Sequence, residues 1–304
     1  MKRIPWLLAC CAVLLCWEAA AQDDFGPITP NTLRVEPIRA GDPGSWILLK
    51  DHREIGSPTF SPDEQWIAFD GYRRGYYGSD AEVWIVRRDG TEVRKLTTGA
   101  TPRWSPDGKR LLFMREKTMR PGAKLGIFVI DRDGKNERFV CPGRWPDWAP
   151  DGKQIAFSRD SRDVPSGGVK SMSRVYVAKP DGSDAKVIAD GDGPSWSPDG
   201  KKIACCYRDP GGRAPASRIV DLEAGSQQII GYGWYRANWS PDGKRVVANG
   251  YTFQGQGMVE LSVLSPSRPE PLFAKYRQPA SPCYSADGKY VVFVARRPPD
   301  DPEK

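Results

Sequence analysis

Histidine is almost absent from this chain of 304 residues, in which His52 is the only one. A Ser/His/Asp triad or histidine acid–base catalysis would have to rely on that one side chain, and a metal site built from several histidines is excluded. His52 ends a short strand-like segment, where a structural or solvent-exposed role is expected. The chain also lacks a Gly-x-Ser-x-Gly elbow, which excludes hydrolase chemistry of that type.

Strong charge of one sign is also missing. The net charge is +7 and no run of five like charges occurs. Nucleic-acid binding is therefore not expected, whereas an anionic partner is permitted without being required.

Long apolar segments are missing too, except at the N-terminus. There Lys2 and Arg3 precede an apolar stretch from residue 4 to 17, and Ala19-Ala20-Ala21 follows. This layout predicts a secretory signal peptide over residues 1–21, a linker over 22–30 and export to the periplasm or another extracytoplasmic space. A lipid anchor at Cys10 is the less favoured alternative, and no other segment is long enough to cross a membrane.

One short motif organises the rest of the chain. It reads aromatic-Ser-Pro-Asp-Gly, with small changes, and it occurs six times, with aromatic residues 44, 44, 48, 43 and 45 positions apart. The six aromatic residues are Phe60, Trp104, Trp148, Trp196, Trp239 and Tyr284. A fixed period of this size is typical of repeat architectures.

Each repeat predicts four antiparallel strands. Ser-Pro-Asp-Gly fits a type I turn, and an uninterrupted apolar run such as Leu111-Leu112-Phe113 follows it, as in a strand that is covered on both faces. A second turn, such as Asp89-Gly90, separates a third strand from a fourth. Four-stranded units repeated radially make a β-propeller, so we predict an all-β, six-bladed β-propeller over residues 31–295.

The ends of the chain predict how the ring closes. The sixth repeat has only two strands before a polar tail at 296–304, while residues 32–38 and 45–50 form two strand-like runs ahead of the first motif. We therefore expect the N-terminal runs to complete the sixth blade by pairing with the C-terminal strands.

The remaining cysteines and acidic residues predict no site. Cys141 falls on an outer strand and Cys283 on an innermost strand, too far apart to be joined. With Cys205 and Cys206 they are expected to be four free thiols, or to form at most one disulfide that the sequence does not place. Asp190-Gly191-Asp192-Gly193 lacks the later ligands of a calcium loop, so no metal and no cofactor is expected.

The aromatic-Ser-Pro-Asp-Gly-Lys repeat resembles the propeller of the TolB-type periplasmic translocation proteins. It resembles equally the propeller domains of prolyl oligopeptidase-type peptidases. The resemblance covers about residues 31–295 and implies the fold much more strongly than the function. TolB-type proteins carry an α/β domain ahead of the propeller, for which only about 35 residues are available here. The peptidases carry a hydrolase domain for which this chain has no room.

The motif turns lie on one face of the predicted ring, and that uniform face is interpreted as scaffold. The loops of the opposite face vary and carry arginine and aromatic residues, the usual anchors of an interface. Candidate binding residues lie in the blade-to-blade loops or on the innermost strands. They are Arg53, Arg103, Arg144, Trp145, Asp147, Trp234, Tyr235, Arg236, Tyr276 and Arg277.

These features favour a monomeric, non-enzymatic scaffold that binds a protein or peptide segment in the cell envelope. A lyase or hydrolase acting on acidic polysaccharides at the channel mouth is the first alternative, and a structural spacer without a ligand is the second. No catalytic residue is assigned under the favoured interpretation.

Overall fold

The computed structural model describes residues 31–37, 45–47, 54–72, 81–116, 124–160, 173–207, 215–232, 234–252, 255–264, 270–273 and 276–296. The expected signal peptide, linker, C-terminal tail and Arg53 lie outside these ranges. Within them the chain forms β-strands and turns, and no helix there is long and apolar enough to span a membrane.

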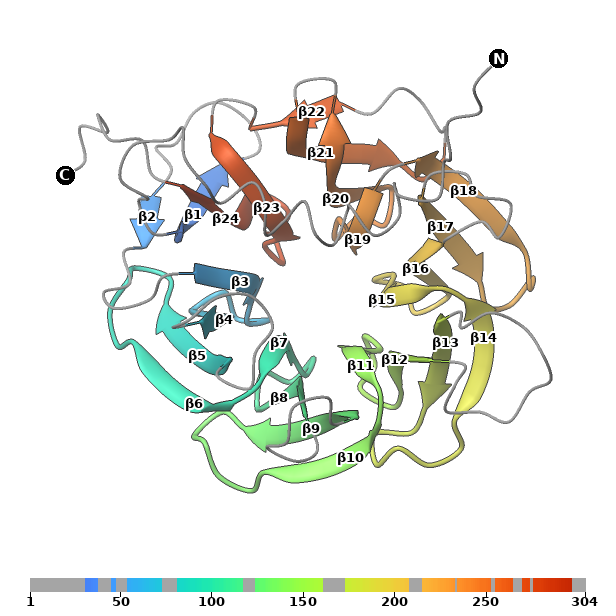
Figure 1. The fold of residues 1–304 in the computed structure, drawn as a ribbon, viewed down its shortest axis with the longest axis horizontal. Helices are drawn as coiled ribbons and strands as arrows, with labels where there is room; N and C mark the ends of the chain where they lie inside the picture. Colours follow the sequence, from blue (N-terminus) through green and yellow to red (C-terminus); the bar gives the residue numbers. More distant parts are fainter. Residues whose placement is uncertain are drawn as a thin grey trace, which may run out of the picture.

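Six four-stranded antiparallel sheets are arranged in a ring (Figure 1). We call the region along the central axis of this ring, between the innermost strands, the channel. Blade 1 contains β3 (Glu54–Phe60), β4 (Trp66–Tyr72), β5 (Glu82–Arg87) and β6 (Arg94–Thr98). Blade 2 contains β7 (Ala100–Trp104), β8 (Arg110–Glu116), β9 (Leu125–Asp131) and β10 (Arg138–Pro142). Blade 3 contains β11 (Arg144–Trp148), β12 (Ile155–Asp160), β13 (Ser173–Ala178) and β14 (Lys186–Asp190).

The second half of the ring repeats this order. Blade 4 contains β15 (Asp192–Trp196), β16 (Lys202–Tyr207), β17 (Ala216–Asp221) and β18 (Gln227–Tyr232). Blade 5 contains β19 (Trp234–Trp239), β20 (Arg245–Thr252), β21 (Gly255–Ser262) and β22 (Glu270–Leu272). Blade 6 contains β23 (Arg277–Tyr284), β24 (Tyr290–Arg296), β1 (Asn31–Pro37) and β2 (Ser45–Ile47).

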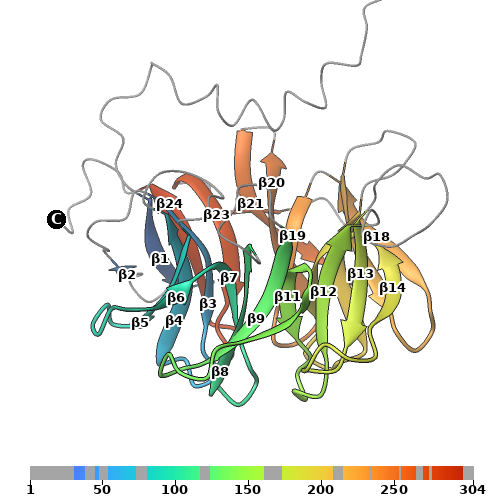
Figure 2. The same ribbon diagram turned by 60° about the horizontal axis from the view of Figure 1, so that its bottom comes forward.

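Blade 6 closes the ring as the sequence predicts. Strand β1 pairs with β24 along its whole length, from Asn31 opposite Arg296 to Pro37 opposite Tyr290, and β2 pairs with β1 as the outermost strand. The first and last described strands therefore lie side by side, as Figures 1 and 2 both show.

The motif turns explain why the same strand pair forms six times. In the second repeat the Ser105 carbonyl accepts a hydrogen bond from the Gly108 N–H at 2.8 Å, and Gly108 has a φ of 67° that suits glycine. The Ser105 hydroxyl donates to Asp107 at 2.5 Å and accepts from the Arg110 N–H at 2.9 Å. Asp107 is therefore used within the turn, and its repeated counterparts serve the same local purpose.

Second strands supply the core between blades. Phe69, Phe113, Phe157 and Phe293 occupy equivalent positions with 0% exposure, and Cys205 fills the same position in blade 4. Burial raises the pKa of the Cys205 thiol, which leaves it as a neutral core group.

Candidate binding site in the central channel

The innermost strands place one residue each at the same level of the channel. These residues immediately precede the motif aromatics, and each pairs with the apolar second strand at the equivalent register position. They are Thr59, Arg103, Asp147, Ser195, Asn238 and Cys283, which we call the channel ring. Each is the penultimate residue of its strand, so the ring lies toward the face that carries the motif turns.

Arg103 crosses the channel at this level. Its Nη2 lies 3.4 Å from the Asn238 Oδ1, which belongs to the blade on the opposite side of the ring, and its Nε lies 3.7 Å from the Asp147 Oδ1. The Asn238 side-chain amide in turn donates to the Pro282 carbonyl at 2.8 Å. One guanidinium thus joins blades 2, 3 and 5, and only 15% of its side chain is exposed.

Asp147 is the acidic member of the channel ring. Its Oδ2 accepts a hydrogen bond from the Trp196 N–H at 2.8 Å, on the next blade. The side chain retains 17% exposure, but the carboxylate is surrounded by protein atoms. That burial raises the pKa of Asp147 to about 6, against the opposing effect of Arg103 and the backbone donors.

This pKa predicts a pH dependence of stability. The folded protein holds the Asp147 proton up to about pH 6, whereas the unfolded chain releases it near pH 4. This group therefore stabilises the folded state at low pH, and the free energy of unfolding should fall by about 2 kcal/mol between pH 4 and pH 7 as the folded group loses its proton. Urea unfolding at several pH values should show this slope in the wild type and a smaller one in Asp147→Asn.

Asp107 supplies the matched control. The Ser105 hydroxyl lowers the pKa of this turn carboxylate, so its stabilising effect is lost only as pH falls below about 4. Asp107→Asn should leave the slope between pH 4 and pH 7 unchanged. Equal slopes in the wild type and in Asp147→Asn would contradict the assignment.

A bulge shapes every innermost strand just before the channel ring. In each innermost strand the pairing register shifts within the three residues that precede the channel-ring residue. The bulged residue has a positive φ in blades 1, 2, 3, 4 and 6. These residues are Ser57, Thr101, Trp145, Gly193 and Ser281. Such bulges bend a strand and change the direction of its side chains, here at the wall of the channel.

Trp145 is the unusual member of this set. A φ of 54° is uncommon for so bulky a residue, and backbone strain of this kind clusters at ligand sites. Trp145 lines a small cleft together with Arg103, Pro146, Gly193, Pro194, Ser195 and Ala237. Trp145 also packs against an apolar cluster formed by Tyr72, Ala81, Ala100 and Met114.

Comparison with known proteins bears on the fold. Neither a protein-family model nor a curated protein matches the sequence. A TolB structure from Agrobacterium tumefaciens superposes with a TM-score of 0.69 at 18% identity, over 89% of this chain and 99% of that one. TolB from Acinetobacter baumannii superposes with a TM-score of 0.60 at 18% identity, over 92% of this chain and 67% of that one.

The fold is that of a TolB-type six-bladed propeller. Oligogalacturonate lyase from Vibrio parahaemolyticus shares the architecture more loosely, with a TM-score of 0.54 at 12% identity over 84% of this chain and 81% of that one. At these identities the similarity concerns the fold, and the site must be judged from its own residues.

The fold brings together three of the residues that the sequence singles out, namely Arg103, Trp145 and Asp147. Arg144 belongs to a different cluster, in which its Nη2 lies 2.9 Å from Asp160 and 3.1 Å from Asp192. Burial disfavours its charge, but these two carboxylates outweigh that effect and raise the pKa of Arg144 above its ordinary value. Its guanidinium is thus engaged within the blade 3–blade 4 wall.

The other candidates lie elsewhere or cannot be assessed. Tyr276 packs its ring on Phe293 at 5.5 Å, and its hydroxyl donates to Glu36 of β1, so it supports blade 6. Trp234, Tyr235 and Arg236 lie on β19, and Arg277 begins β23. Their side chains, like all of Arg53, lie outside the part of the chain that the structure describes.

Sequence reasoning missed Asn238 as the partner of Arg103. The two residues are separated by 135 positions. A usable signal is that both residues immediately precede a motif aromatic, which puts both on the innermost strands that form the channel wall.

Proposed function

We propose that this protein is an exported, TolB-like scaffold that binds a protein or peptide segment in the channel, without catalysing a reaction. The observation that carries the proposal is Arg103, whose side chain crosses the channel near the motif-turn face. Arg103 and Trp145 both line a small cleft at this level, which we call the socket. An aromatic residue beside an arginine is the combination that most often anchors a binding partner.

The charge of the socket favours an acidic side chain in the bound segment. The Arg103 contact with Asn238 is long, at 3.4 Å, and the opposing carboxylate of Asp147 lies 3.7 Å from Nε. A carboxylate delivered by a partner would form a charge-assisted, bidentate pair that is stronger than either contact. The basic net charge of the chain also favours an acidic partner.

Site-specific crosslinking tests this proposal. A photoreactive amino acid replacing Trp145 should crosslink to a protein of the native cell envelope, because Trp145 is one of the residues that line the socket. The same group at Val187, an exposed position on the outer strand β14, should give no such product. Crosslinking from both positions, or from Val187 alone, would contradict the proposal.

Affinity for the purified crosslinked partner then isolates the role of charge. Arg103→Gln should weaken binding by about tenfold or more, since a charge-assisted contact is lost. Lys153→Ala is the matched control, because Lys153 lies on the motif-turn face with 82% of its side chain exposed. Turnover of uronate oligomers by the wild type that is lost in Arg103→Gln would instead favour a polysaccharide-cleaving enzyme.

A further inference from the structure

Five of the six junctions between blades are closed by the same contact on the motif-turn face. The glycine of each motif turn lies against the proline of the preceding blade, with 3.4–3.9 Å between the proline ring and the position of a glycine β-carbon. The pairs are Gly108 with Pro62, Gly152 with Pro106, Gly200 with Pro150, Gly243 with Pro198, and Gly288 with Pro241. Because glycine has no side chain and proline is compact, these junctions pack tightly.

The junction between blade 6 and blade 1 departs from this pattern on both sides. Glu64 occupies the glycine position, and Ala286 occupies the proline position of the preceding blade. Glu64 has a φ of 56°, a conformation that suits glycine far better than glutamate. Local strain of this kind at one of six equivalent positions indicates a purpose that the other five do not share.

The Glu64 carboxylate bridges the junction. One oxygen accepts a hydrogen bond from the Asp287 N–H of blade 6 at 2.7 Å, and the other lies 2.8 Å from the Arg88 Nη1 of blade 1. Arg88 also stacks on the Tyr290 ring of β24, with its guanidinium carbon 4.3 Å from the ring centre. Glu64 and Tyr290 thus fix the guanidinium in one orientation.

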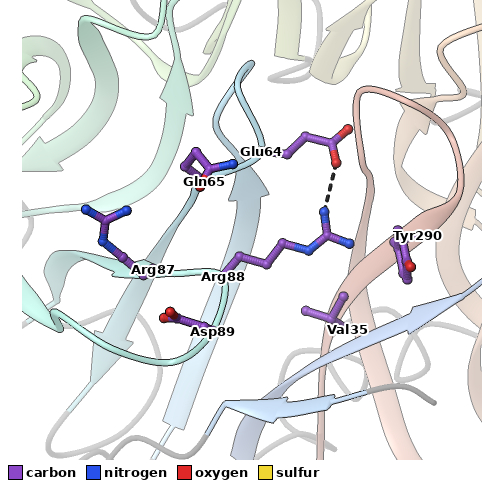
Figure 3. Close-up of a pocket in the computed structure, with 7 residues that line it drawn as sticks. All are labelled: Val35, Glu64, Gln65, Arg87, Arg88, Asp89 and Tyr290. Carbon is purple, nitrogen blue, oxygen red and sulfur yellow. Dashed lines mark hydrogen bonds and ion pairs between the residues drawn. The ribbon is translucent and has the colours of Figure 1, made fainter. Parts of the chain in front are cut away.

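A cavity of about 400 Å³ lies at this junction. Its lining consists of Val35, Glu64, Gln65, Arg87, Arg88, Asp89 and Tyr290 (Figure 3). Figure 3 shows Arg88 extending across it from the blade 1 side toward Val35 and Tyr290, with Gln65, Arg87 and Asp89 on the blade 1 side. Its volume is within the range of small-molecule sites.

The polar groups of the cavity define what it can bind. Among the described residues Arg88 uses only Nη1 in a side-chain hydrogen bond, so Nη2 and Nε remain as donors, held in place for a carboxylate. Asp89 uses Oδ1 to hold Thr91, at 2.9 Å from its N–H and 2.7 Å from its hydroxyl. Its Oδ2 is left as an acceptor, and Gln65 adds an amide.

We propose that this junction is a binding site for a small carboxylic acid that carries a second polar group, an amino or a hydroxyl group. The carboxylate pairs with Arg88, and the second group bonds a polar atom elsewhere in the lining, such as Oδ2 of Asp89. The site shares no lining residue with the socket and is independent of the partner proposed above.

Binding of small acids to the full chain tests the proposal. L-Alanine, L-glutamate, L-lactate and L-malate are titrated by calorimetry, with acetate as the carboxylate-only probe. At least one of the four should bind about tenfold more tightly than acetate, and the amino and hydroxy acids distinguish the two donor types. If none binds more tightly than acetate, the proposal is wrong.

Two variants locate the binding. Glu64→Gly combined with Ala286→Pro restores the regular junction, so it should fold with an unchanged or higher melting temperature and lose binding.

Arg88→Lys should weaken binding about tenfold or more, because lysine lacks the planar set of donors. Arg132→Lys is the control, because Arg132 is the counterpart of Arg88 in blade 2. Its backbone N–H donates to the Lys109 carbonyl, as the Arg88 backbone N–H donates to the Gln65 carbonyl. Equal affinity in the wild type and the double variant would overturn the proposal.

Discussion

Deleting residues 290–304 will abolish the cooperative unfolding transition of this protein. The deletion removes β24, which is the only described strand that joins the N-terminal strand β1 to β23. It also removes Val291, Val292 and Phe293, all with 0% exposure, and leaves β1 paired only with the short outermost strand β2. The loss exceeds the net stability of a typical domain, about 5–15 kcal/mol, and a melting curve followed by circular dichroism should show no sharp transition.

A shorter deletion provides the control. Removing residues 297–304 takes away only the polar tail beyond β24, and the melting temperature should stay that of the full chain. A sharp transition at the original temperature after the longer deletion would show that the ring does not depend on closure by the chain ends.

Phe157→Ala should be among the most destabilising single substitutions. The Phe157 ring is fully buried and stacks on Tyr176 with 5.6 Å between centroids and an angle of 8° between planes. It also covers the Gly143 backbone, where even a β-carbon would lie 2.8 Å from the ring. Truncation should cost about 3–5 kcal/mol, measured as the change in free energy of unfolding in urea.

Cys205→Ala is the matched comparison, since Cys205 fills the same position in blade 4 and is also fully buried. Loss of a sulfur atom leaves a much smaller cavity than loss of a phenyl ring, so the cost should be about 1 kcal/mol. If the two variants lose similar free energy of unfolding, the stability that this position contributes does not depend on the buried volume of its side chain.

The architecture could be predicted because its determinants are local and repeated. Each Ser-Pro-Asp-Gly turn forms from hydrogen bonds among five or six consecutive residues, as Ser105 and Asp107 show. The apolar run after it then forms the second strand, and the regular spacing leaves few alternatives to a ring. The closure of blade 6 also followed, because the two missing strands at one end were present at the other.

The channel could be predicted only in part. Arg103 and Asp147 were identifiable from their place before a motif aromatic, but the contact of Arg103 with Asn238 depends on the diameter of the ring and the length of one side chain. The bulge before each ring position has no sequence signature here, since serine, threonine, tryptophan and glycine all occupy it. The bulges therefore escaped a prediction that assumed regular strands.

The motif-turn face was interpreted as uniform scaffold, and the junction of blade 6 with blade 1 is the exception. The replacement of glycine by Glu64 and of proline by Ala286 is visible in the sequence. The significance of this replacement cannot be seen in the sequence, because the two residues lie 222 positions apart and meet only when the ring closes. Each residue looks like an ordinary deviation from the motif until the packing of the five regular junctions is known.

Ring closure also sets an order of events during synthesis. Strand β1 precedes the other five blades in the chain and β24 follows them, yet each completes the other's hydrogen bonding. Five blades can form their own hairpins as the chain emerges, whereas one edge of β1 stays unpaired until β24 has been made. During that interval the edge is open to pairing with other strands.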